Sequence, residues 1–220
     1  MEHTPVLLAE VIHYLKPEPN QFFIDGTVGL GGHAATLLSH ALPGGRLLGI
    51  DRDATNLAQA KLRLAEFKES VVLVCDSYAN MRMHAQTHGF GSVNGILLDL
   101  GFSSVHVDDP QRGFSFQSDG PLDMRYDLNQ ALTAQEIVNA WPEDELARIF
   151  RVYGEEPQAR IIAQAIVTQR ASTVLTRTSE LAELVARTVR QRGKIHPATQ
   201  VFQALRIAVN DELGELERAL

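Results

Sequence analysis

A glycine-rich turn framed by acidic residues is the first feature of this sequence that could do chemistry. The stretch FFIDGTVGLGGHAATLL, residues 22–38, places Gly29, Gly31 and Ala34 in the spacing G-x-G-x-x-A, and Asp51 follows 20 residues after Gly31. Glycines in this spacing let the backbone approach a nucleotide closely, and an acid at that distance can bind ribose hydroxyl groups. The pattern alone suits NAD(P) and S-adenosylmethionine equally well.

Asp25 separates these two ligands by its charge. It ends the apolar run before the turn, where a dinucleotide would place its pyrophosphate. Like charges there would repel by several kcal/mol at about 4 Å and an effective dielectric constant of about 20. S-adenosylmethionine instead brings an ammonium and a sulfonium group. Asp25 alone could also be a helix cap or a turn residue, but Asp51, Asp76 and Asp99 also stand at or after apolar runs, and this set favours the cationic methyl donor.

Other reactive side chains give weaker signals. His84 and His88 are four residues apart on an expected helix and could begin a zinc site, but no third ligand stands nearby, so no metal is expected. Cys75 is the only cysteine and lies in an apolar run. It is expected to be a small buried residue rather than a nucleophile.

Short apolar runs alternate with helical patterns in the first 100 residues, and these elements must position the acids. Strands are expected at residues 22–25, 46–51, 71–76 and 94–100, and helices at residues 4–15, 33–42 and 54–67. This order predicts a doubly wound α/β fold with a parallel sheet. The carboxyl ends of such strands meet at one edge, where ligands bind.

The pattern changes after Leu100. Residues 101–127 are rich in Gly, Ser, Asp and Pro and predict a long loop, which in a compact domain is functional or disordered. A capping box at Thr133 and Glu136 opens a helical region, with further helices expected at residues 143–153, 159–171, 178–192 and 197–220. A four-stranded sheet would leave one edge poorly covered, so we expect the C-terminal strands to be missing and the chain to be part of a longer protein.

Composition and charge narrow the class of protein. The 220 residues are 45% hydrophobic and 21% charged, as in ordinary globular proteins, and no apolar run is long enough to cross a bilayer. The single cysteine excludes an internal disulfide, and we expect a cytoplasmic protein. The net charge is −7, yet residues 146–210 contain ten Arg or Lys and four Asp or Glu. This segment could meet RNA phosphates or could be a set of solvated helix faces.

Eight segments together resemble a known family. They are HTPVLL, DGTVGLGGH, GIDRD, GILLDLG, DDPQRGFSF, DGPLDMR, YGEE and FQALRIAVNDELGELE, in that order. From residue 3 to residue 220 the sequence resembles the RsmH/MraW family, bacterial S-adenosylmethionine-dependent methyltransferases that act on N4 of a cytosine in the decoding region of 16S ribosomal RNA. The resemblance implies cytosine N4-methylation of 16S rRNA, with the small ribosomal subunit as partner and ribosome biogenesis as the setting.

The resemblance also implies an architecture. A Rossmann-like class I methyltransferase sheet is expected to carry an inserted all-helical domain. Residues 1–103 and 207–220 would form the S-adenosylmethionine-binding domain. Residues 104–206 would form the loop and the helical insertion for substrate recognition.

Site residues follow from the matching positions and from the acids discussed above. The expected cofactor contacts are Asp25, Gly31, Gly32, His33, Asp51, Tyr78, Asp99 and His106. Asp51 would bind the ribose and Tyr78 would lie by the adenine. His106 stands where the family usually carries glutamine, and Gln200 stands where it usually carries arginine.

The expected chemistry is methyl transfer to a weakly nucleophilic amine. Because the sulfonium methyl group is already electrophilic, the enzyme mainly holds N4 in line with it, which can account for roughly 7–11 kcal/mol. Asp99 is the candidate catalytic residue as acceptor of an N4 proton, or it binds only the cofactor. The target base must first be swung out of its stack.

The loop is expected to contact substrate RNA. Arg112 and Arg125 could meet phosphates. Phe114 and Phe116 could stack on the base or could anchor the loop to the helical domain. Two other functions stay open on the sequence, an NAD(P)-dependent oxidoreductase and a non-catalytic RNA-binding assembly factor.

Overall fold

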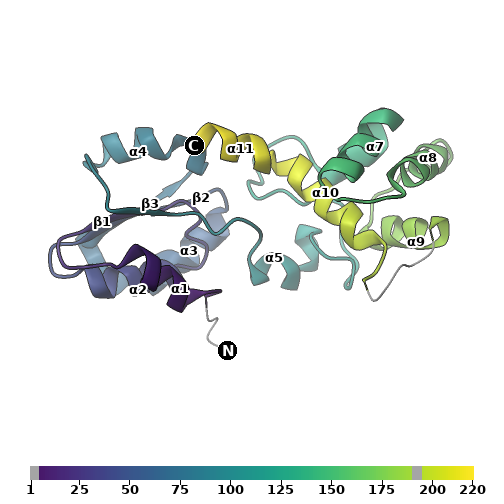
Figure 1. The fold of residues 1–220 in the computed structure, drawn as a ribbon. Coiled ribbons are helices and arrows are strands. Elements are labelled where there is room, and N and C mark those ends of the chain that lie inside the picture. The colour runs from purple at the N-terminus through teal and green to yellow at the C-terminus, as the bar shows by residue number, and fades with distance from the viewer. Residues whose placement is uncertain (1–4, 190–194) are drawn as a thin grey trace. The chain divides into compact units, whose positions relative to one another are not determined.

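The computed structural model describes residues 5–189 and 195–220 and divides the chain into two compact units (Figure 1). Residues 1–101 together with residues 214–220 form the first, called here the α/β unit. Residues 102–213 form the second, called here the helical unit. The sequence predicted unit boundaries between residues 103 and 104 and between residues 206 and 207. In the structure, residues 207–213 belong to the helical unit instead. They do so because Val209 and Asn210 are buried in that unit.

The α/β unit contains a four-stranded parallel sheet in the order β3-β2-β1-β4. Its strands are β1 (Phe22–Asp25), β2 (Arg46–Asp51), β3 (Val71–Cys75) and β4 (Gly95–Leu97). The predicted α/β class with a parallel sheet is confirmed. In register, Asp25 pairs with Gly49 and Leu97, and Asp51 pairs with Cys75, so the acids gather at the carboxyl edge.

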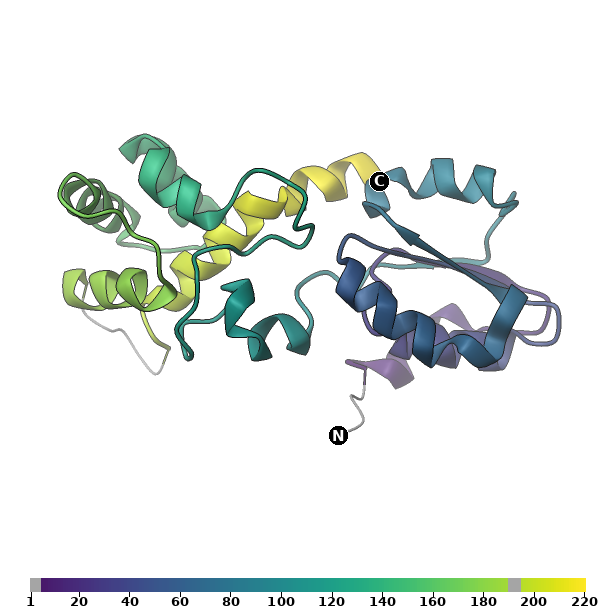
Figure 2. The ribbon, with the colours of Figure 1, turned by 180° about the vertical axis from the view of Figure 1, so that it is seen from behind.

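Helices cover both faces of this sheet (Figures 1 and 2). The helices of the unit are α1 (Leu8–Leu15), α2 (Gly32–Ala41), α3 (Ala54–Arg63) and α4 (Met81–Thr87). Phe23 and Leu47 point toward the face that α1, α2 and α3 cover, whereas Ile24 and Leu48 point toward α4. This alternation is the two-residue period of a strand, and it explains why the strands read as continuous apolar runs.

The two outer strands are less protected than the inner ones. Among the described residues β3 pairs only with β2, and β4 pairs only with β1. Ile96 of β4 is 45% exposed. Cys75 is exposed at the end of β3, so the prediction that it is buried was wrong, because β3 is an edge strand. The expectation that further strands follow stays a prediction.

Five helices among the described residues of the helical unit share one core, and the short helix α5 (Ser104–Asp108) precedes them. The five are α6 (Ala134–Ala140), α7 (Glu143–Val152), α8 (Ala159–Arg170), α9 (Thr178–Thr188) and α10 (Ala198–Asn210). In α7 the buried residues are Leu146, Ile149 and Phe150, the i, i+3, i+4 spacing of one helix face. None of the helices that the structure describes is long and apolar enough to span a bilayer.

One predicted helix is two. The segment expected as a helix over residues 197–220 breaks at Asp211, whose φ is +48°, and α11 (Glu212–Ala219) follows. The side chain of Asn210 turns inward at this point, accepting a hydrogen bond from the Tyr126 N–H and donating one to the Met124 carbonyl. Tertiary contacts therefore end α10 where local pattern alone would continue it.

Other bounds also differ from the expectation: the strand of residues 94–100 is only Gly95–Leu97, and the helix of residues 178–192 ends at Thr188. The first helix begins at Leu8, and the predicted cap at Thr4 lies outside the described residues. The helix of residues 54–67 ends at Arg63 and continues as a 3₁₀ segment (Ala65–Ser70). The loop expected over residues 101–127 contains α5 and a short 3₁₀ turn (Pro110–Arg112).

Arg206 connects the two ends of the helical unit. Its guanidinium carbon lies 4.9 Å from the centre of the Phe102 ring. The same group donates hydrogen bonds of 2.8 and 3.0 Å to the carboxylate of Glu212. The chain therefore enters and leaves this unit at neighbouring points.

Candidate functional site

The glycine turn after β1 opens α2 with its backbone in a conformation that side chains disfavour. Gly29 and Gly31 have φ values of +51° and +80°, in the left-handed region. A Cβ at Gly31 would lie 3.3 Å from the Cα of Ala60, which leaves almost no room. The turn thus brings its N–H groups and the N-terminus of α2 to the carboxyl edge of the sheet.

Asp51 ties this turn to the end of β2. Its Oδ2 accepts a hydrogen bond of 2.9 Å from the Gly29 N–H, and its Oδ1 accepts one of 2.8 Å from the Asp53 N–H. Asp53 in turn caps α3 by accepting from the Thr55 N–H at 2.7 Å. Asp51 therefore lies beside the glycine turn, where the sequence placed it, and its contact with a ribose stays a prediction.

Asp25 is completely buried at the end of β1. Its Oδ1 accepts a hydrogen bond of 3.1 Å from the Thr27 N–H, whereas its buried Oδ2 has no hydrogen-bond partner among the described residues. Burial raises the pKa of Asp25 to about 7, and the negative charges of Asp51 and Asp99 add to this effect. A cation placed beside Oδ2 would favour the ionised carboxylate.

Asp99 lies just after β4 and faces solvent. Its backbone N–H donates to Thr27 Oγ1 at 2.7 Å, so the turn after β1 and the end of β4 are connected. Its side chain is 51% exposed and lies 3.9 Å from Nδ1 of His33. His33 Nε2 lies 2.9 Å from the Val6 carbonyl, and because a carbonyl only accepts, this nitrogen carries the proton.

Tyr78 begins a 3₁₀ turn (Tyr78–Asn80) after β3. A Cβ at Gly26 would come within 2.9 Å of the Tyr78 Cβ and 2.6 Å of Leu98 Cδ2. Gly26 therefore lets Tyr78 lie close to the first turn. This places Tyr78 at the same edge of the sheet as the three acids.

Asp76 is held by the turn and the helix that follow it. Burial alone would raise its pKa, but hydrogen bonds from His84, Ser77 and Asn80 outweigh this and hold the pKa of Asp76 below its usual value. The Asp76 Oδ2 lies 2.7 Å from His84 Nε2. His84 and His88 stack with ring centres 6.2 Å apart, and within the described ranges no group of three His, Cys, Asp or Glu is placed to hold a metal ion.

The structure thus brings most of the predicted cofactor residues to one edge of the α/β unit. These are Asp25, Gly31, Gly32, His33, Asp51, Tyr78 and Asp99. His106 and the four predicted RNA contacts belong to the helical unit instead.

His106 is part of a capping box and of an aromatic stack. As the third residue of α5 it accepts a hydrogen bond of 3.1 Å from the Ser103 N–H at Nδ1, the task usually given to Glu or Gln. Its ring, 3% exposed, has its centre 4.8 Å from that of Phe114 and 5.2 Å from that of Tyr126. A cofactor contact by His106 stays a prediction.

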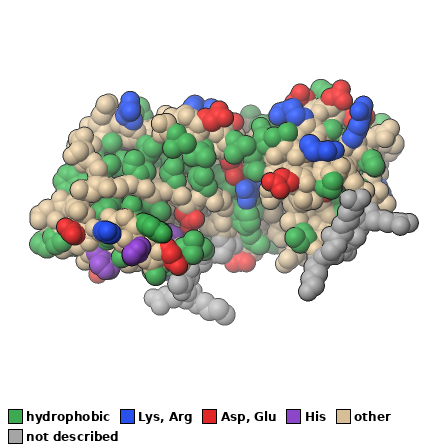
Figure 3. Space-filling view, in the orientation of Figure 1, with side chains coloured by type: hydrophobic (Ala, Val, Ile, Leu, Met, Phe, Trp, Pro, Cys, Tyr) green, Lys and Arg blue, Asp and Glu red, His purple; other side chains and the backbone are tan. Residues whose placement is uncertain are grey.

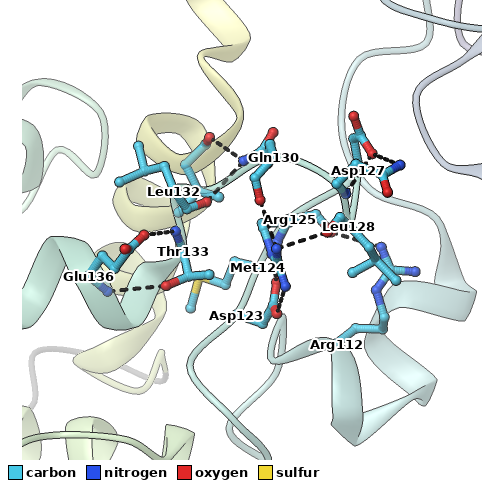
Figure 4. Close-up of polar contacts among 12 residues, drawn as sticks. Arg112, Asp123, Met124, Arg125, Asp127, Leu128, Gln130, Leu132, Thr133 and Glu136 are labelled. Atoms are coloured by element: carbon cyan, nitrogen blue, oxygen red, sulfur yellow. Dashed lines mark hydrogen bonds and ion pairs between the residues drawn. The ribbon is translucent and has the colours of Figure 1, made fainter.

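Arg125 and Arg112 fasten the long loop to itself (Figure 4). Arg125 donates two hydrogen bonds to Asp123, at 2.8 and 2.7 Å, and two to the carbonyls of Leu128 and Gln130, at 2.9 and 2.7 Å. Arg112 is 7% exposed and donates to the carbonyls of Arg125 and Tyr126. A phosphate contact would require these hydrogen bonds to be exchanged, and for both residues it stays a prediction.

Phe114 and Phe116 pack inward against the helical core. The Phe114 ring stacks on Tyr126 with centres 5.4 Å apart, and Phe116 meets Phe202 edge to face at 4.9 Å. Both are only partly buried. These contacts are those of a loop anchor, the alternative to stacking on a base, and the base contact stays a prediction.

The basic segment of residues 146–210 is mixed with acids in space. Figure 3 shows Lys and Arg side chains beside Asp and Glu on the visible face of the helical unit. Arg148 pairs with Glu145, and Arg177 pairs with Asp119. A groove of about 430 Å³ between α8 and α9 is lined by Ile161, Gln164, Ala165, Thr168, Gln169, Ser172, Leu184 and Thr188. This groove offers apolar and hydrogen-bonding contacts rather than a charged channel.

Sequence reasoning missed two residues that shape the site. Thr27 accepts the Asp99 N–H and donates its own N–H to Asp25. Its place in the segment DGTVGLGGH is the signal that could have found it. Glu215 accepts a hydrogen bond from Ser77, the residue before Tyr78. Glu215 and Ser77 are 138 residues apart, and no local sequence pattern predicts such a contact.

Comparison with known proteins places these features in a family. The model of the MraW methylase family matches residues 1–220. Ribosomal RNA small subunit methyltransferase H of Heliobacterium modesticaldum is 48% identical over 99% of this chain and 71% of that protein. The protein of the same name from Syntrophotalea carbinolica is 49% identical over 100% of this chain and 71% of that protein. A solved rRNA methylase from Streptococcus thermophilus aligns at 19% identity over 38% of this chain and 49% of that chain, with a TM-score of 0.31.

Proposed function

The chain belongs to the MraW methylase family, and on that premise we propose that it transfers methyl groups from S-adenosylmethionine to small-subunit ribosomal RNA. The relatives at 48% and 49% identity bear the name of such an enzyme. An rRNA substrate implies action in the cytoplasm, on RNA within the assembling small subunit. No observation favours hydride transfer with NAD(P) or a purely non-catalytic role.

The observation that carries the proposal is the buried carboxylate of Asp25 beside the glycine turn. Its Oδ2 is buried without a partner among the described residues, and Asp51 and Asp99 contribute further negative charge. A pyrophosphate would be repelled here, whereas the ammonium and sulfonium groups of S-adenosylmethionine would be attracted. The residues present therefore fit this cofactor.

The residues of the edge divide the binding task. Asp51 would bind the ribose hydroxyl groups and Tyr78 would lie against the adenine. Gly31, Gly32 and His33 would line the turn, and Asp25 would face the positive charge. When bound, S-adenosylmethionine supplies an electrophilic methyl group.

Asp99 is the proposed catalytic residue for methylation of a cytosine N4. Its carboxylate is half exposed, so a base can reach it, and its backbone is fixed by the hydrogen bond to Thr27. By accepting a hydrogen bond from the exocyclic amine, Asp99 would orient the nitrogen lone pair and take up its proton. The finer assignment, N4 of one cytosine in the decoding region of 16S rRNA, rests on the family resemblance.

The helical unit is the proposed RNA-recognition element. The proposed RNA contacts lie in one loop, whose shape is held by its internal hydrogen bonds and stacking. They are Arg112, Arg125, Phe114 and Phe116. His106 fixes the start of the same segment through α5. Binding that involves phosphates should weaken as salt is raised.

A methyl-transfer assay tests the proposal. Immature small subunits would be incubated with the protein and S-adenosylmethionine labelled in its methyl group, and the labelled nucleotide would be mapped. Asp99→Ala should lose most transfer while keeping affinity for S-adenosylhomocysteine within about tenfold. Asp144→Ala, an exposed acid on α7, is the matched control and should transfer normally.

Three outcomes would count against the proposal. Tight NADH binding without S-adenosylhomocysteine binding would support an oxidoreductase. RNA binding without any transfer by the unmodified protein would support an assembly factor. Label on a nucleotide other than a cytosine would overturn the N4 assignment.

A further inference from the structure

Glu215 in α11 is a carboxylate that no step of the proposed chemistry uses. It accepts a hydrogen bond from the hydroxyl of Ser77, and its side chain is only 15% exposed. Arg218 contributes a nitrogen 3.0 Å from the carboxylate, and Arg52 contributes one at 3.8 Å. Figures 1 and 2 show the end of α11 beside the start of α4, within the α/β unit.

Ser77 connects Glu215 to the turn that follows β3. Its Oγ accepts the Ala79 N–H at 3.0 Å and so caps the 3₁₀ turn that begins at Tyr78. Its own N–H donates to Asp76 Oδ1 at 2.7 Å. Because a serine hydroxyl has one proton, donating it to Glu215 leaves the oxygen as acceptor for Ala79. The carboxylate therefore selects the rotamer in which Ser77 caps the turn.

Arg52 extends the contact to the end of β2. It directly follows Asp51, whose carboxylate is tied to the glycine turn. Glu215 thus contacts the residue before Tyr78 and the residue after Asp51. Tyr78 and Asp51 are the two predicted contacts to the adenosine part of the cofactor.

We propose that Glu215 is a positioning residue for the adenosine half of S-adenosylmethionine: through Ser77 it fixes the turn that carries Tyr78, and through Arg52 the segment that carries Asp51. The inference rests on the proposed function, because it assumes that these residues bind the cofactor. A largely buried carboxylate held by a hydroxyl and two guanidinium groups is costly to desolvate, and positioning a binding site explains its presence.

The test is a double-mutant cycle on cofactor affinity with the full chain. Isothermal titration with S-adenosylhomocysteine would be performed on the unmodified protein, Glu215→Gln, Ser77→Ala and the double variant. Glu217→Gln is the matched control, since it makes the same change on the exposed side of the same helix. Thermal unfolding without ligand would be recorded for each protein.

Each single change should raise the Kd about tenfold, the loss of one hydrogen bond to a charged group, and the double variant should be no weaker than the weaker single variant. Glu217→Gln should bind as the unmodified protein does. Methyl-transfer kinetics should show a raised KM for S-adenosylmethionine with kcat changed less than twofold.

Normal affinity in Glu215→Gln, or effects that simply multiply in the double variant, would overturn the inference. If Glu215→Gln is unfolded, Ser77→Ala still decides, because a folded variant with normal affinity has the same meaning. Absence of S-adenosylhomocysteine binding by the unmodified protein would instead refute the proposed function itself.

Discussion

The backbone N–H of Gly29 donates a hydrogen bond of 2.9 Å to Oδ2 of Asp51, so the glycine turn and the end of β2 are one structure. The same carboxylate holds the Asp53 N–H with its other oxygen. Asp51 therefore shapes the turn before any ligand arrives. A residue expected to bind a ribose has a structural task as well.

Asp51→Asn should impair both tasks. Asparagine offers one acceptor oxygen in place of two, so either the Gly29 or the Asp53 hydrogen bond is lost. We expect a loss of about 1–3 kcal/mol in the free energy of unfolding. The Kd for S-adenosylhomocysteine should rise at least tenfold. Urea unfolding and calorimetric titration measure the two effects, and unchanged affinity in a folded variant would remove Asp51 from the site.

Asp25 should make folding stability depend on pH. Because burial raises the pKa of Asp25 from an ordinary 3.8 to about 7 in the folded protein, the folded state binds this proton more tightly than the unfolded state does. Its contribution is therefore fully present below about pH 4 and is lost as pH rises through about 7. Asp25→Asn should remove this loss and be more stable than the unmodified protein at pH 8, by at most about 4 kcal/mol. Denaturant unfolding at pH 5 and pH 8 checks this, and equal pH profiles would contradict it.

Cofactor affinity should also depend on the Asp25 carboxyl group, but it should rise with pH where folding stability falls. The ammonium and sulfonium groups of the cofactor prefer the ionised carboxylate, so the affinity for S-adenosylmethionine should increase as pH rises from 6 to 8 and protons should be released on binding. Titrations in buffers of different ionisation enthalpy measure this release. In Asp25→Asn the release from this group should vanish, and proton release that persists there would assign it to another residue.

Arg125→Ala should show whether Arg125 stabilises the loop or contacts RNA. Removing a guanidinium that donates to Asp123, Leu128 and Gln130 should cost about 2–4 kcal/mol of stability, since it leaves a carboxylate and two carbonyls without it. The control is Arg160→Ala, an exposed residue of α8. If Arg125 instead reaches phosphate, stability should change little and the salt dependence of RNA binding should weaken by about one unit of slope.

His106→Gln should be tolerated better than His106→Ala. Glutamine can still accept the Ser103 N–H and so keep the capping box, but it loses the stacking with Phe114 and Tyr126. We expect costs of about 1 kcal/mol for the glutamine and about 2 kcal/mol for the alanine. Thermal unfolding of the two variants measures the order, and a reversed order would show that the hydrogen bond accepted from the Ser103 N–H does not stabilise this helix start.

The sequence predicted what depends on local pattern. Three strands of the sheet were placed within one residue, because each is a short apolar run bounded by polar or turn residues. The acids at the ends of those runs were expected at one edge, since parallel strands bring their carboxyl ends together. Asp25, Asp51 and Asp99 are found there.

What was missed depends on distant partners. The break at Asp211 follows from the hydrogen bonds of Asn210 to residues 84 and more positions earlier in the chain. The exposure of Cys75 follows from the place of β3 at the edge of the sheet, which the run VVLVCD does not reveal. The roles of Arg112 and Arg125 depend on how the loop folds back on itself. The sequence alone does not distinguish an arginine that binds phosphate from one that donates to backbone carbonyls.

The contact of Arg206 with both Phe102 and Glu212 bears on how such a protein can arise. One guanidinium holds the beginning and the end of this segment close together, and each doubling of the length between them adds only about 0.6 kcal/mol of closure cost. Such a segment can be gained, exchanged or enlarged as a cassette while the surrounding sheet keeps its register. Under the proposed division of tasks, substrate recognition by this segment and cofactor binding by the α/β unit could then evolve separately.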